Sequence, residues 1–208
     1  MKRKGFTLIE LLVVIAIIGI LATFLIPAVL GALQDANITK MQANGKSIYT
    51  SVFREVSQGR DNWPDEPTYS TSVEWFEYLV DPTNATMEVS FDFFGGPGLK
   101  LAKSIDPNDF DEDNCAWSFV DSVGLKKDTV PLLVSRNYTA ATIAATTGGS
   151  GSDFSSSVGE TGNVGLVFNE DEVLVVRKGG AAERITEPDF KDSANLNPTD
   201  DTLDVVHP

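Results

Sequence analysis

An uncharged apolar run near the N-terminus limits what this chain can fold into. No Asp, Glu, Lys or Arg occurs in the 23 residues from Leu11 to Leu33. At about 1.5 Å per residue, a helix of this length measures about 35 Å, whereas the hydrocarbon core of a bilayer is about 30 Å thick. The segment is therefore long enough to span a membrane.

Charges flank this run unevenly. Lys2, Arg3 and Lys4 precede it, and the next basic residue is Lys40, so the positive-inside rule places the N-terminus in the cytoplasm and the remainder outside. Glu10 directly precedes this run, within the start of the apolar segment that begins at Phe6, where a carboxylate is costly unless it has a partner or snorkels to the interface. From the residues alone, a cleaved secretory signal with a cut near Gly31 and an ordinary signal anchor also stay open.

A specific resemblance favours a third interpretation. The stretch KGFTLIELLVVIAIIGILA, residues 4–22, resembles the leader and first helix of type IV pilins and type II secretion pseudopilins, and the resemblance covers about residues 1–33. It implies that a membrane prepilin peptidase cuts after Gly5 and N-methylates Phe6, while the apolar helix is retained. It also implies that Glu10 meets the N-terminal amine of a neighbouring subunit during assembly.

The resemblance implies partners as well. These are the prepilin peptidase/N-methyltransferase, other copies of the chain with related pseudopilins, and an assembly platform in the inner membrane. Pro27 cannot donate a backbone hydrogen bond and should kink or loosen the helix locally, and the family's helix can unwind near such a proline in assembled filaments.

The rest of the chain predicts an α+β head. We expect a leader at 1–5, a transmembrane and filament-core helix at 6–33, an amphipathic continuation at 34–58 ending at a Gly59 cap, and an acidic head at 59–208. In the head, we expect a short helix capped by Ser72, and alternation over 87–93 indicates a strand. Further strands are expected at 116–120, 130–135, 164–168 and 172–177, with a hairpin joining the last two, and a short final strand follows a turn near Gly179. The fold class is thus a long N-terminal helix packed on a small antiparallel sheet, as in pilins.

Two segments of the head have no clear regular pattern. Residues 139–163 are rich in Ala, Thr, Gly and Ser, so we expect a flexible surface insertion there, with a binding loop as the alternative. The C-terminal tail is polar, and we expect it to be mostly irregular.

Composition excludes several functions. Residues 59–208 hold 10 Lys or Arg against 27 Asp or Glu, a charge that repels nucleic-acid phosphates, so we expect no nucleic-acid partner. The chain has one cysteine, Cys115, and one histidine, His207, so it can form neither an internal disulfide nor a His/Cys zinc site. We expect Cys115 to be a small buried group and His207 to fray at the terminus, which leaves no catalytic triad and predicts that the chain is not an enzyme.

Acidic clusters raise the question of calcium. Asp109, Asp111 and Asp113 have the spacing of the first half of an EF-hand loop, but Asn114 and Val120 stand where the loop needs Gly and Glu. The tail offers Asp200 and Asp201 with nearby Asn and Asp oxygens. Calcium is the only cofactor that these residues suggest, and solvated surface acids are the alternative.

The sequence therefore predicts a structural subunit of a type II secretion pseudopilus that is anchored in the inner membrane by one span, with its head in the periplasm or outside the cell. A type IV pilus subunit, serving adhesion, motility or DNA uptake, is the alternative within the family. A signal-anchored or secreted acidic binding protein is the alternative of another class.

Overall fold

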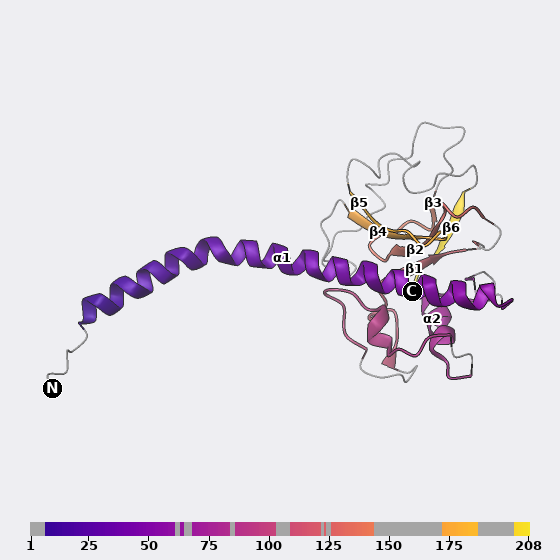
Figure 1. Ribbon diagram of the computed structural model, residues 1–208, viewed down its shortest axis with the longest axis horizontal. Coiled ribbons are helices and arrows are strands. Elements are labelled where there is room, and N and C mark those ends of the chain that lie inside the picture. The colour runs from indigo at the N-terminus through magenta and orange to yellow at the C-terminus, as the bar shows by residue number, and fades with distance from the viewer. Residues whose placement is uncertain are drawn as a thin grey trace, which may run out of the picture. The chain divides into compact units, whose positions relative to one another are not determined.

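The computed structural model describes most of the chain (Figure 1). The described residues are 7–60, 63–64, 68–83, 86–102, 109–121, 123, 126–143, 172–186 and 202–208. The chain divides into two compact units, Met1–Ala36 and Asn37–Pro208. Helix α1, Leu8–Ser57, begins in the first unit and ends in the second.

The C-terminal end of α1 is closed by a glycine, as expected. Gly59 has a φ of 85°, a left-handed conformation that costs glycine little. The N–H of Gly59 donates to the carbonyl of Val56 at 3.0 Å, and that of Arg60 donates to the carbonyl of Glu55 at 3.1 Å. These two bonds form a Schellman motif, which satisfies helix carbonyls that would otherwise lack donors.

From residue 37 onward, α1 packs one face on the second unit. The buried positions of this part recur every three or four residues, which is the amphipathic period expected for a helix on a core; they are Ile38, Met41, Gly45, Ile48, Val52 and Glu55. At Gly45 the packing is close, because an added Cβ would lie 2.6 Å from Cγ2 of Val176 on the sheet. The predicted amphipathic stripe is therefore confirmed.

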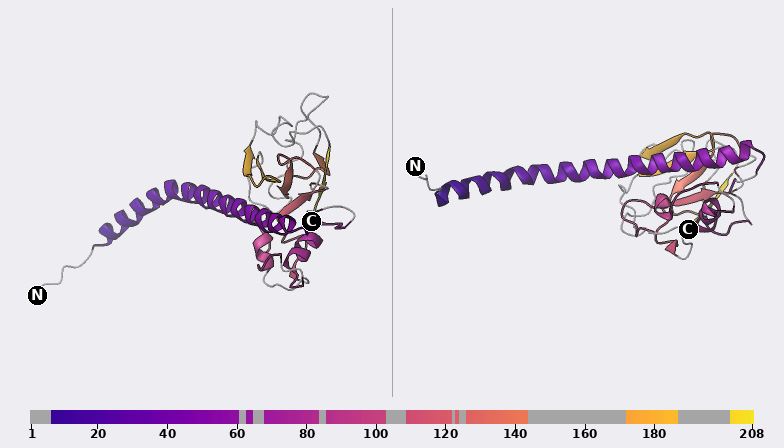
Figure 2. Two further views of the ribbon diagram at one scale, coloured as in Figure 1. Left: turned by 45° about the vertical axis from the view of Figure 1, so that its right-hand side comes forward. Right: turned by 60° about the horizontal axis from the view of Figure 1, so that its bottom comes forward.

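The strands of the described residues form a single antiparallel sheet (Figures 1 and 2). Its six strands are β1 (Trp117–Val120), β2 (Pro131–Ser135), β3 (Thr142–Ile143), β4 (Glu172–Arg177), β5 (Ala182–Thr186) and β6 (Leu203–Val206). Their order is β3-β6-β1-β2-β4-β5. The expected α+β class is thus confirmed, and β1, β2, β4 and β5 lie where the sequence predicts strands.

Helix α2, Ser72–Val80, packs beside this sheet. Its cap is Thr71, whose side chain accepts from the N–H of Glu74 at 3.2 Å, so the expectation of a Ser72 cap is wrong. Ser72 is instead the buried first helical residue, and its hydroxyl donates to the carbonyl of Trp117 at 2.7 Å. The helix thus contacts β1 through its first residue as well as through its apolar face.

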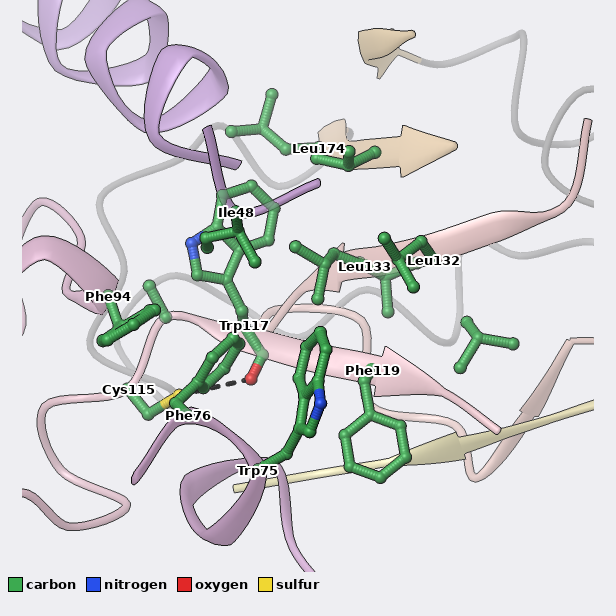
Figure 3. Close-up of a cluster of buried hydrophobic side chains, with 14 of the residues drawn as sticks. Ile48, Trp75, Phe76, Phe94, Cys115, Trp117, Phe119, Leu132, Leu133 and Leu174 are labelled. Atoms are coloured by element: carbon green, nitrogen blue, oxygen red, sulfur yellow. Dashed lines mark hydrogen bonds between the residues drawn. The ribbon is translucent and has the colours of Figure 1, made fainter. Parts of the chain in front are cut away.

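Aromatic rings fill the core around β1 (Figure 3). Trp117, Ile48 of α1 and Leu133 of β2 are fully buried there, and Trp75 of α2 meets Phe119 edge-on at 5.7 Å between ring centroids. Cys115 is fully buried, as expected, and its Sγ lies 3.3 Å from the carbonyl oxygen of Trp117. Burial raises the pKa of the thiol to about 11, so Cys115 acts as an apolar core residue.

The predicted strand over 87–93 is wrong. Residues Phe91–Phe94 form a 3-10 helix, η1, because Phe91 and Phe94 are the buried pair and lie three residues apart. Phe91 stacks on Phe110 at 4.6 Å, and Phe94 stacks on Phe76 of α2 at 4.5 Å. The alternation over 87–93 suggested a strand because Phe93, which is only half-buried, fits a period of two residues.

The expectation for the C-terminus is also wrong in part. Strand β6 pairs with β1 and with β3, and His207, which we expected to fray, is anchored on three sides. Its ring bonds to Ser118 Oγ at 2.9 Å and to the Ala140 carbonyl at 3.1 Å, and its own carbonyl accepts from the Ser72 N–H at 3.1 Å. Apolar residues Leu203, Val205 and Val206 supply the burial that makes this end fold.

Two expectations fall at least partly outside the described residues. The strand at 164–168 and the hairpin that follows it lie there, and so do residues 144–163 of the expected insertion. The start of that insertion is described, and it holds β3, which the sequence reasoning missed.

Candidate assembly site

The N-terminal turn of α1 is built around Thr7 and Glu10. The backbone N–H and the hydroxyl of Thr7 both donate to Oε2 of Glu10, at 2.8 and 2.6 Å. In return, Oγ1 of Thr7 accepts from the N–H of Glu10 at 3.3 Å. This is a reciprocal capping box, which satisfies donors that a helix N-terminus leaves unpaired.

Sequence reasoning named Glu10 but missed this local role. The signal was present, because Thr followed three residues later by Glu, just before an apolar run, is the sequence signature of a capping box. The carboxylate also lies at the positive end of the helix dipole, which favours a negative charge. Thr7 and the dipole together hold the carboxylate in one place.

One carboxylate oxygen of Glu10 is left for another partner. Only Oε2 is engaged by Thr7, and no other described residue forms a hydrogen bond or ion pair with Glu10. The residue is exposed. The site can therefore accept a cationic donor at Oε1 without breaking the capping box. Gly5 and Phe6, the predicted cleavage and methylation positions, lie outside the described residues.

An apolar surface follows this turn. Helix α1 is long and apolar enough to cross a membrane, judged by length and composition, and its most apolar stretch is not buried in the chain. Large apolar side chains between Leu8 and Leu33 are 45–81% exposed, among them Leu8, Ile9, Leu11, Leu12, Ile15, Ile18, Leu21, Phe24, Leu25 and Leu30. Such a surface needs lipid or other apolar chains to cover it.

Pro27 lies within α1 and does not end it. Pro27 has no N–H for the carbonyl of Thr23, four residues earlier. The hydroxyl of Thr23 donates to the carbonyl of Gly19 at 2.9 Å, a back-bond that is typical of Thr inside apolar helices. The helical backbone continues through this segment, and unwinding near Pro27 on assembly stays a prediction.

The candidate calcium ligands are only partly described. Among the described ranges, no group of three or more His, Cys, Asp or Glu side chains is placed to hold a metal ion. Asp111 accepts from the N–H of Asp113 at 2.9 Å, and its other oxygen lies 4.0 Å from Nζ of Lys100, while Asp109 is exposed. Asp200 and Asp201 lie outside the described residues.

Asn114 gives no support for a cation in the first cluster. Its side-chain oxygen accepts from the N–H of Asp111 at 2.6 Å, so this oxygen is already engaged. Its buried Nδ2, which lacks a hydrogen-bond partner in the described part of the chain, is a donor and repels a cation. Calcium binding therefore stays a prediction from the sequence.

Known proteins share the N-terminal segment. The model of the prokaryotic N-terminal methylation motif matches residues 1–26. The major component of the type IV wide pilus of Thermus thermophilus is 65% identical over 42 residues, which cover 20% of this chain and 32% of that protein. The type IV major fimbrial protein of Dichelobacter nodosus is 37% identical over 71 residues, 34% of this chain and 44% of the relative. This chain is a homologue of type IV pilins and type II secretion pseudopilins.

This pilin homologue has relatives in both branches of the family. The type II secretion system core protein G of Vibrio cholerae is 37% identical over 76 residues, which cover 32% of this chain and 52% of that protein. The chain thus spans about a third to a half of the length of these three curated relatives. No solved structure matches it.

The matches refine the functional expectation. Most of these relatives are pilus or fimbrial subunits, so they favour the type IV pilus alternative over the secretion pseudopilus that the sequence reasoning placed first. The named relatives are components of pili, fimbriae and a secretion system, which supports the expectation of a structural protein over that of an enzyme.

Proposed function

We propose that this chain is a structural subunit of a type IV pilus. It is inserted with its N-terminus in the cytoplasm, cleaved after Gly5, methylated at Phe6 and polymerised through its retained helix. Residues 6–33 serve as the membrane and filament-core segment, residues 34–58 carry this helix into the head, and the acidic head at 59–208 faces water. The motif over residues 1–26 and the names of the relatives support this assignment.

Assembly changes the surroundings of the apolar helix. In the membrane its exposed side chains meet lipid, and in a filament they meet the same segment of other copies. Because lipid tails are as apolar as these side chains, the exchange brings no large hydrophobic gain. An assembly platform in the inner membrane must therefore drive extraction, and close packing between helices retains the subunit.

The observation that supports this function most directly is the half-engaged carboxylate of Glu10. Cleavage after Gly5 would create a cationic amine on Phe6. In a filament, Oε1 of Glu10 accepts a hydrogen bond from this amine of an adjoining copy. Among apolar helices an unpaired charge is strongly unfavourable, so only the register that pairs the two groups is stable. The Thr7 bonds hold Glu10 ready for this contact.

Three single substitutions separate this pairing from capping. Glu10→Leu removes both roles, Glu10→Gln keeps an acceptor for Thr7 but removes the charge, and Thr7→Val removes the hydroxyl cap but keeps the carboxylate. A lost cap costs about 1 kcal/mol, whereas breaking a buried ion pair by removing one partner costs about 3–5 kcal/mol. We expect all three variants to enter the membrane at wild-type levels.

Filament yield distinguishes the two roles of Glu10. It is measured by electron microscopy and by the amount of subunit that shearing releases from cells. Glu10→Leu and Glu10→Gln should each reduce yield at least tenfold, and Thr7→Val should stay within about twofold of wild type. Equal yields for Glu10→Gln and wild type would show that the charge is not needed. Equal losses for Thr7→Val and Glu10→Leu would reduce Glu10 to a capping residue.

A secretion pseudopilus is the second candidate, and the Vibrio cholerae relative supports it. The two functions differ in what the loss of the gene does. Deletion of a pilus subunit removes surface filaments and leaves exported enzymes outside the cell. Deletion of a pseudopilus subunit leaves surface filaments in place and traps exported enzymes in the periplasm. We expect the first result.

A further inference from the structure

Charge is distributed unevenly over the head. Between residues 61 and 99 there are eight Asp or Glu and no Lys or Arg. By contrast, four of the ten basic residues of the head fall in two short segments, Lys126, Lys127, Arg177 and Lys178. Although the head as a whole is strongly acidic, it therefore carries one concentrated source of positive charge.

Backbone contacts hold these two segments together as one surface. We call the turns at 126–130 and 177–180 the basic turns. The N–H of Lys178 donates to the carbonyl of Val130 at 2.9 Å, and that of Gly179 donates to the carbonyl of Asp128 at 2.7 Å. A Cβ on Gly179 would lie 2.9 Å from the same Asp128 oxygen, so the glycine permits this close approach.

Within the basic turns, Lys127 is the basic residue whose ammonium group is available to a partner. Arg177 pairs with Glu183 at 2.9 Å, and Nζ of Lys178 donates to the carbonyl of Lys126 at 2.6 Å while it lies 5.6 Å from the ring centre of Trp63. Lys127 is exposed and forms no ion pair with any residue that the structure describes.

A complementary hollow lies on α2. It measures about 360 Å³, and the residues that line it include Glu74, Glu77 and Asp81 together with Tyr78 and Phe91. One oxygen of Glu74 accepts from the Ser70 N–H and one of Asp81 accepts from Thr83. Burial, together with the nearby charge of Glu74, raises the pKa of Glu77. A cation in the hollow would relieve this repulsion, and the half-buried Tyr78 ring can contact the apolar stem of a lysine.

The hollow and the basic turns lie on different parts of the head. Helix α2 packs on β1 through Trp75 and Phe119, whereas the second basic turn follows β4, which β2 separates from β1. A contact between two such different surfaces is head-to-tail. Repeated contacts of this kind build rings or open helical chains, whereas a two-fold dimer needs the same surface on both copies.

We propose that the hollow on α2 of one copy receives Lys127 of a second copy. The proposal rests on the proposed function, because it assigns a lateral contact between heads that the polymerising helices bring together. Acidic heads repel one another, and this contact offsets the repulsion while it fixes their relative orientation.

Disulfide trapping in the full-length chain tests the contact. Cells co-express Glu77→Cys and Lys127→Cys chains with different tags, and membranes and filaments are oxidised mildly. Buried Cys115 should not react, and cells with either variant alone control for this. A matched pair, Glu112→Cys with Lys127→Cys, places the first cysteine at an exposed acid outside the hollow.

We expect a mixed-tag dimer from the Glu77 and Lys127 pair, at least fivefold stronger than from the Glu112 pair. Filaments that form but give no such dimer, or equal dimer from both pairs, would overturn the contact and leave the filament function standing. A mixed dimer in membranes that yield no filaments would support the contact and count against the filament function.

Charge reversal gives a second readout. Glu77→Lys and Lys127→Glu should each lower filament yield at least threefold, because each places like charges together. The double variant in one chain should recover part of the yield, because residues 77 and 127 again carry opposite charges, while Glu74 and Asp81 stay acidic. If the double variant is as poor as the worse single variant, the two residues do not meet.

Discussion

At the scale of single residues, His207 shows how a terminal side chain becomes structural. Its Nε2 faces the Ala140 carbonyl, which only accepts, so this nitrogen carries the proton and Nδ1 accepts from the Ser118 hydroxyl. This arrangement belongs to the neutral ring, which the lowered pKa of His207 favours at neutral pH. Burial is the main cause that lowers the pKa of His207, although the Ala140 bond opposes it, and the nearby charge of Arg136 lowers it further.

The contribution of His207 to stability should therefore fall in mild acid. The pKa of His207 in the folded chain is below its unfolded value of about 6.5, so the unfolded chain binds the proton more tightly. The contribution of His207 to stability is therefore complete above about pH 6.5, and it is lost as the pH falls through the pKa of the folded chain. His207→Asn should lower the free energy of unfolding by about 1 kcal/mol at pH 7.5 and flatten its change between pH 7.5 and 5. Urea unfolding in detergent, followed by tryptophan fluorescence, measures the free energy of unfolding at each pH. If His207→Asn leaves the change of this free energy between pH 7.5 and 5 as in the wild type, His207 does not have this role.

The sequence could identify Glu10 as the important acid because a charge in an apolar run is conspicuous. It could not place His207, because nothing local marks a residue whose partners, Ser118 and Ala140, lie far away along the chain. Contacts of this kind depend on strand pairing that only the whole fold determines.

At the scale of elements, the helix-on-sheet contact depends on Gly45. A Cβ there would meet Cγ2 of Val176 at 2.6 Å and the Trp117 ring at 3.0 Å, both from side chains that are fully packed. Neither can move aside without disturbing the sheet, so the contact sets how closely α1 approaches β1 and β4.

Gly45→Ala should lower the free energy of unfolding by about 1–3 kcal/mol, because overpacking outweighs the gain in helix propensity of about 1 kcal/mol. Gly31→Ala is the matched control, since nothing lies within 4 Å of its added Cβ. Urea unfolding of the full chain in detergent compares the two variants. A Gly45→Ala chain as stable as the control would show that helix and sheet are not closely packed there.

Elements with a sustained pattern could be predicted, and short ones could not. The stripe on α1 and the apolar runs of β1, β2 and β4 are long enough to reveal their period. Phe91–Phe94 is too short to tell a period of three from one of two, and β6 was hidden in a polar tail although Leu203, Val205 and Val206 are apolar. For such segments the outcome depends on what they pack against.

At the scale of the whole molecule, the account joins an apolar helix with a strongly acidic head. Each part alone is compatible with other proteins, because a secreted binding protein can be acidic and a signal sequence can be apolar. A filament subunit needs the helix to remain attached to the head after the leader is removed, whereas a secreted protein loses it and a signal-anchored protein keeps the leader as well. The retained helix is therefore the central claim.

The intact mass of the chain, purified from the membranes of its host, tests this claim most directly. We expect a single species that lacks Met1–Gly5 and carries one added methyl group on Phe6. A species cut near Gly31, or one that still begins at Met1, would contradict the account.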